Sequence, residues 1–138
     1  MFWPVVDPRS LEEGVFPKGM SRPVKGVKLL GGSVTLDMEF AKELSKKRVE
    51  KSIALMEAVS QLGDPQCELL LLRNCAGVAK LYFALRTCSP YAFEEAQILF
   101  DKELRVALEK AITASGPGFG QWQWRLASLP IRKGGLGI

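Results

Sequence analysis

The chain contains no histidine, which excludes several kinds of active site at once. A Ser-His-Asp triad, a Cys-His pair, a histidine general base and a histidine-ligated metal all need that side chain. Cysteines number only three, and the spacing of Cys67, Cys75 and Cys88 does not match a zinc site. We therefore expect no metal, no cofactor, and reduced thiols in an intracellular protein of the nucleus or the cytoplasm.

Long apolar runs and a secretory leader are missing too. Apolar runs such as Leu69–Leu72 are far too short to span a membrane. The first residues, Met1–Pro4, lack the basic and apolar regions of a secretory signal. We expect no membrane partner, and no motif in the sequence indicates a small-molecule substrate.

Carboxylates arranged for catalysis are scarce. Asp37, Asp64 and Asp101 occur singly, at helix starts or on a solvated face, and no pair lies in a strand-turn context that would hold two metal ions. Cys75 falls among apolar positions without a neighbouring base. We expect no catalytic residue and no enzymatic activity of the isolated chain.

The composition that is present is that of an ordinary globular domain. Apolar residues make up 47% and charged residues 25% of 138 residues, enough for one domain with its own core. The 19 lysines and arginines exceed the 15 acidic residues, which gives a net charge of +4. This mild excess is compatible with a nucleic-acid partner but does not demonstrate one.

Helical patterns dominate after residue 34. Capping and stop signals predict helices over 36–62, 64–85 and 91–113, with Thr35 as the first N-cap, and a short fourth helix over 121–129. Because short connections favour antiparallel neighbours, we expect a mainly α fold, a three-helix antiparallel bundle with the short fourth helix.

The apolar residues predict which helix is central. The second helix is apolar except for a narrow stripe at Arg73, Gly77, Lys80 and Ala84, so we expect it to be the most buried. The first helix has two apolar lines that do not superpose, which predicts a bend or two packing partners. These lines consist of Leu36, Phe40 and Leu44, and of Val49, Ile53, Met56 and Val59.

The N-terminal part differs in composition. Prolines and glycines interrupt residues 1–34 and predict an extended segment, with a short strand over 24–30 that ends at Gly31-Gly32. Residues 35–138 then form the helical domain.

Basic side chains in three places are candidates for binding nucleic-acid phosphates. If they do so, the lysines of the first helix should share a face with Arg73 and Lys80. Alternatively, the first-helix group is a solvated face with pairs such as Glu43–Lys47. Trp122 and Trp124 suit base stacking, or else they close the end of the core. The candidate residues are Lys46, Lys47, Arg48, Lys51, Arg73, Lys80, Arg125, Arg132 and Lys133.

Several blocks of sequence resemble one family, the plant reverse transcriptases of non-LTR retrotransposons. The similarity extends over most of the chain, from about Trp3 to Ile138. Its blocks are Arg22–Gly32, Asp64–Arg73, Lys80–Cys88, and Gln123–Pro130 followed by Gly134–Gly137.

The resemblance implies a part of an RNA-directed DNA polymerase downstream of the catalytic palm. The helices would correspond to the thumb and its connection, which grip primer–template through backbone contacts, and the chain would be a fragment. No Tyr-x-Asp-Asp motif is present, so the metal-binding aspartates of the family have no counterpart here. The expected partner is therefore an RNA or DNA duplex, bound weakly and without sequence preference. The alternative is a small helical protein-interaction module, or an inactive relic that binds no nucleic acid.

Overall fold

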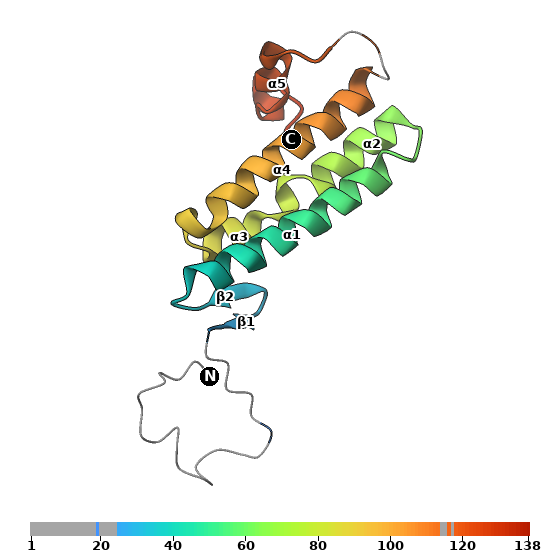
Figure 1. Ribbon diagram of the computed structural model, residues 1–138. Helices are drawn as coiled ribbons and strands as arrows, with labels where there is room; N and C mark the ends of the chain where they lie inside the picture. The colour runs from blue at the N-terminus through green and yellow to red at the C-terminus, as the bar shows by residue number, and fades with distance from the viewer. Residues whose placement is uncertain (1–18, 20–24, 114–115, 117) are drawn as a thin grey trace.

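A computed structural model describes residue 19, residues 25–113, residue 116 and residues 118–138. This part of the chain is mainly helical with one small sheet, which confirms the expected mainly α composition of the fold (Figure 1). The elements are β1 (Val27–Leu29), β2 (Gly32–Val34), α1 (Met38–Val59), α2 (Pro65–Leu71), η2 (Leu72–Ala76), η3 (Val78–Lys80), α3 (Tyr82–Thr87), α4 (Pro90–Thr113), α5 (Gln121–Ala127) and η4 (Ile131–Lys133).

The two long helices, α1 and α4, lie side by side and run in the same direction (Figure 1). Near their first turns, Lys42 Nζ lies 3.4 Å from Glu95 Oε1. Near their last turns, Lys110 Nζ donates to Ser60 Oγ at 3.1 Å. Residues 65–87 return in the opposite direction and pack against both helices, so the chain goes up, down and up again (Figure 1).

The first helix begins two residues later than its predicted start at residue 36. The Asp37 carboxylate accepts hydrogen bonds from the amides of Glu39 and Phe40, so Asp37 and not Thr35 is the N-cap. The Thr35 hydroxyl instead bonds the Lys25 carbonyl, which ties the preceding segment to the start of the helix. Thr35 and Asp37 are both good caps, and the sequence alone did not distinguish them.

The buried face of α1 is a single stripe, which corrects the expectation of two separate apolar lines. Its members recur every three or four residues, and two of them, Ala41 and Ser45, are too small to stand out in a hydrophobicity pattern. Leu36, which began the first predicted line, precedes the helix and is 88% exposed. The stripe consists of Ala41, Ser45, Val49, Ser52, Met56 and Val59.

The predicted continuous helix over 64–85 is wrong, because this stretch consists of four short pieces. The Gly77 amide bonds the Leu72 carbonyl at 2.6 Å and closes a π-helical turn, and Gly77 itself is extended, at φ −79° and ψ −151°. A Cβ atom at Gly77 would lie 2.5 Å from the Leu72 oxygen, so this close approach requires glycine. A short 3-10 turn and α3 follow.

The expectation that the 64–85 region is the most buried is also wrong. Leu72 and Leu81 are buried as expected, but Leu70, Tyr82 and Leu85 are exposed. Gly77 and Ala84, assigned to the polar stripe, are instead buried. α4 contributes more buried residues than any other element: Ala92, Phe93, Ala96, Phe100, Leu104, Leu108 and Ala111.

The predicted strand is one arm of a hairpin whose second arm was not anticipated. β1 and β2 pair antiparallel, with Lys28 opposite Ser33. Leu30 and Gly31 form the turn with φ of 49° and 91°, the positive values that a two-residue hairpin turn requires. Gly31 and Gly32, which were predicted to end the strand, therefore lie where the chain reverses direction into β2. Residue 24 and most of the N-terminal segment lie outside the described residues.

The C-terminal part packs over α4. Arg105 donates hydrogen bonds to the Phe119 carbonyl and to Gln121 Oε1, and this contact fixes the start of α5. α5 ends two residues before the predicted residue 129. Trp124 packs on the core, whereas Trp122 is 72% exposed. The expectation that both tryptophans close the end of the core is therefore wrong for Trp122.

Candidate nucleic-acid interface

Basic side chains from three separate elements line one surface hollow of about 660 Å³. Lys28 comes from β1, Lys51 from α1 and Lys80 from η3, and Lys47 and Arg48 of α1 complete the basic lining. The hairpin and the π-helical break bring these distant parts of the sequence together. One acidic residue, Glu50, also lines the hollow. Five positive charges against one negative charge make a local field that attracts an anion, although the net charge of the whole chain is small.

Arg48 is held in place by two contacts within the protein. Its Nη2 donates to the Gly31 carbonyl in the hairpin turn, and its guanidinium carbon lies 5.8 Å from the centre of the Phe83 ring. This geometry fits a cation–π interaction. Arg48 therefore joins the hairpin, α1 and α3, and it is less available to phosphates than the lysines beside it.

Lys47 is engaged in a local ion pair on α1. Its Nζ lies 2.6 Å from Glu43 Oε1, one helical turn away. The hydrogen bond and the charge of Glu43 raise the pKa of Lys47 above its ordinary value, and those of Lys47 lower the pKa of Glu43. This is the pair that the solvated-face alternative anticipated. Among the described residues, no ion pair involves Lys28, Lys51 or Lys80, which leaves these three charges for an anionic partner.

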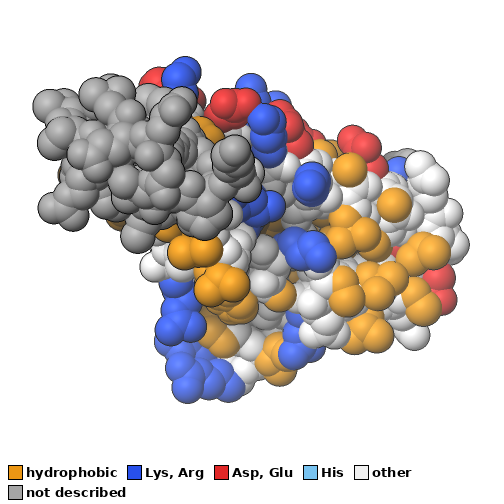
Figure 2. All heavy atoms as spheres, turned by 90° about the horizontal axis from the view of Figure 1, so that it is seen from below, with side chains coloured by type: hydrophobic (Ala, Val, Ile, Leu, Met, Phe, Trp, Pro, Cys, Tyr) orange, Lys and Arg blue, Asp and Glu red, His pale blue; other side chains and the backbone are white. Residues whose placement is uncertain are grey.

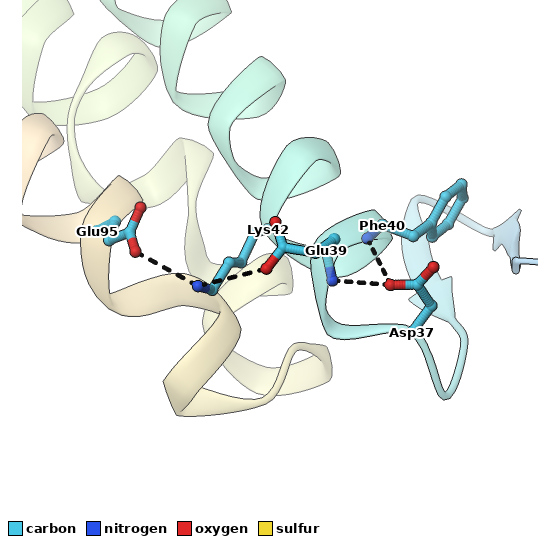
Figure 3. Close-up of polar contacts among 5 residues, drawn as sticks. All are labelled: Asp37, Glu39, Phe40, Lys42 and Glu95. Carbon is cyan, nitrogen blue, oxygen red and sulfur yellow. Dashed lines mark hydrogen bonds and ion pairs between the residues drawn. The ribbon is translucent and has the colours of Figure 1, made fainter.

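Lys46 lies in a different hollow from Lys47, Arg48 and Lys51. It shares this hollow with Lys42 and with the acidic side chains of Glu39, Glu43 and Glu95. Figure 3 shows Lys42 between Glu39 and Glu95, where it links α1 to α4. Glu95 contributes most to raising the pKa of Lys42. The mixed charge makes this hollow a poor phosphate site.

The remaining candidates do not line the basic hollow either. Arg73 of η2 lies against the C-terminal segment, where its Nε is 3.6 Å from the position of a Cβ at Gly137. Arg125 is exposed on α5, and Arg132 and Lys133 are exposed on η4. Of the five residues expected to share one face, Lys47, Lys51 and Lys80 line the hollow together, and Lys46 and Arg73 do not.

Lys28 and Phe83 line the hollow, but the sequence did not predict either of them as a site residue. Lys28 was assigned to the strand but not to the site, because only the hairpin brings it near α1. Phe83 was assigned to the core, and yet it is 46% exposed at the hollow. The alternation Lys25, Val27, Leu29 in the strand already placed Lys28 on the opposite face, and this was the one signal that the sequence offered for it.

The described residues show no other chemistry of a functional site. Cys67 and Cys75 are exposed, Cys88 is partly buried, and these three thiols form no disulfide. No group of three or more acidic or cysteine side chains in the described ranges could hold a metal ion. No described helix is long and apolar enough to cross a membrane. No family model, curated protein or solved structure matches the chain.

Proposed function

We propose that the chain is a non-catalytic, thumb- or connection-like part of a retrotransposon reverse transcriptase that grips primer–template nucleic acid through its phosphates. The observation that carries this proposal is the meeting of Lys28, Lys51 and Lys80 around one hollow. The resemblance of the sequence blocks supports the polymerase origin. The up-down-up course of α1, residues 65–87 and α4 supports a thumb-like helical bundle.

Such a site attracts nucleic acid without choosing a sequence. A lysine ammonium is a flexible point charge that neutralises a phosphate, and it carries no fixed pattern of donors for reading base edges. A polymerase must accept every template, so contacts of this kind suit its thumb. The isolated chain would bind weakly, because three available lysines release few counterions.

A salt titration against a labelled RNA–DNA hybrid tests this proposal. Each phosphate contact contributes a slope of about −0.9 to the log–log dependence of affinity on salt, so three lysines predict a slope of about −3. The affinity should fall in the non-specific range, with Kd of about 10⁻⁴ to 10⁻⁶ M at physiological salt. Two hybrids of different sequence should bind equally. Absence of binding at low salt, or binding that does not respond to salt, would overturn the proposal.

The exposed apolar side chains favour a second candidate, a small helical protein-interaction module. Seen from the hairpin end, Figure 2 shows apolar side chains next to lysines and arginines on the same surface. Tyr82, Tyr91 and Ile98 are among the large apolar residues that are exposed. Such residues are enriched where another protein binds. This candidate predicts no affinity for the hybrid at any salt concentration.

A further inference from the structure

The lining of the basic hollow is apolar as well as charged. Leu30, Leu44 and Phe83 line it together with the lysines, and Leu30 at the hairpin turn is 91% exposed. Phosphates interact with the lysines only, so a ligand that presents nothing but phosphates leaves the apolar side chains of the lining in contact with water. A ligand with both phosphates and flat apolar groups covers both parts.

The Phe83 ring lies between neighbours from the hairpin and from α1. A Cβ atom at either Gly31 or Gly32 would lie 3.6 Å from Phe83 Cε1, so the hairpin turn lies close to one edge of the ring. The Arg48 guanidinium lies over the ring and is itself bonded to the Gly31 carbonyl. An aromatic ring and a guanidinium plane that are already ordered lose little entropy when a base stacks on them.

The hollow is large enough to take up a nucleotide base. Its volume of about 660 Å³ lies within the roughly 300–1,000 Å³ of pockets that enclose small organic molecules. In a duplex the bases are stacked inside and only phosphates, sugars and groove edges reach a surface hollow. In a single strand the bases can turn outward and stack on a protein side chain.

We propose that the hollow binds an unpaired stretch of the nucleic-acid strand, with one base stacked at Phe83 and the flanking phosphates at Lys28, Lys51 and Lys80. This inference rests on the proposed function. In a primer–template this is the single-stranded part of the template beside the hybrid. Stacking does not depend on the identity of the base, so the lack of sequence preference is retained.

The test compares three labelled ligands of equal length by fluorescence anisotropy. These are oligothymidylate, an abasic strand with the same phosphates, and oligothymidylate annealed to oligodeoxyadenylate. The variants are Phe83→Leu, which keeps apolar volume without an aromatic face, and Phe83→Tyr, which keeps the face. Circular dichroism confirms that both variants retain the helical signal of the wild type.

The wild type should bind oligothymidylate about fivefold or more tightly than the abasic strand, and also more tightly than the duplex. Phe83→Leu should remove this preference without changing the affinity for the abasic strand, and Phe83→Tyr should restore it. Equal binding of all three ligands, or tighter binding of the duplex, overturns the stacking inference and leaves the proposed function in place. Absence of binding to any ligand at low salt overturns both.

Discussion

The Ser52 hydroxyl on α1 donates a 2.7 Å hydrogen bond to the Ala76 carbonyl, the last residue of the π-helical turn. Both residues are fully buried. If the π-helical pattern continued, the Leu81 amide would donate to the Ala76 carbonyl. It donates instead to the Val78 carbonyl, at 2.9 Å. Ser52 thus satisfies a buried acceptor that the break in the helix leaves behind.

Replacement of Ser52 by alanine should lower the free energy of unfolding by about 1–3 kcal/mol, because it leaves a buried carbonyl without its partner. Urea denaturation measures this change. Ser45→Ala is the matched control, since the Ser45 hydroxyl is equally buried but bonds the Ala41 carbonyl of its own helix, which the helix already satisfies. Equal losses in the two variants would contradict the special role of the Ser52 contact.

Replacement of Gly77 by alanine should destabilise the protein by about 1–3 kcal/mol. The new methyl group would meet the Leu72 carbonyl at 2.5 Å, and backbone atoms cannot move aside as a flexible side chain can. Gly118→Ala provides the comparison, because no atom lies within 4 Å of a Cβ there. Thermal unfolding should show a clear loss for the first variant and little change for the second. A neutral Gly77→Ala would mean that residues 72–80 rearrange freely.

The long helices could be predicted from the sequence because their signals are local. Pro90 marks the start of α4, and apolar residues at helical spacing mark its buried face. The break at Gly77 could not be predicted, because its causes are a backbone close approach and a partner, Ser52, that lies 24 residues away in the sequence. Periodicity reports which side chains are apolar and carries no information about such contacts.

Acidification should lower the free energy of unfolding, in part because Asp64, the N-cap of α2, becomes protonated. A hydrogen bond from the Cys67 thiol, followed by the Cys67 and Gln66 amides, holds the pKa of Asp64 below its ordinary value of 3.8. A depressed pKa in the folded state contributes stability above pH 3.8, and this contribution is lost as the pH falls through the folded value.

The variant Asp64→Asn isolates this contribution, because asparagine caps a helix about as well but does not titrate. Unfolding by urea, measured from neutral to acidic pH, should show a smaller loss of stability in the variant than in the wild type below about pH 4. Parallel curves for the two proteins would show that the Asp64 carboxylate has the same pKa in both states.

The site could be predicted only in part. Lys47 and Lys51 could be identified because they belong to the densest basic cluster of the sequence, and Lys80 because it lies in an otherwise apolar stretch. The separation of Lys46 from Lys47 could not be foreseen without knowing which side of α1 faces the hairpin. Adjacent residues on a helix point about 100° apart, so a dense basic run always spreads over more than one face.

The site is tested most directly by two triple variants that remove equal charge. Lys28, Lys51 and Lys80 line the hollow, whereas Lys46, Lys102 and Lys110 do not. The measurement is the affinity of each variant for the RNA–DNA hybrid across a range of salt concentrations. Replacement of the first set by alanine should weaken binding and bring the salt slope close to zero, whereas replacement of the second set should leave the slope near that of the wild type. Equal weakening by both sets would contradict the proposed site, because the nucleic acid would then respond to the net charge of the chain alone.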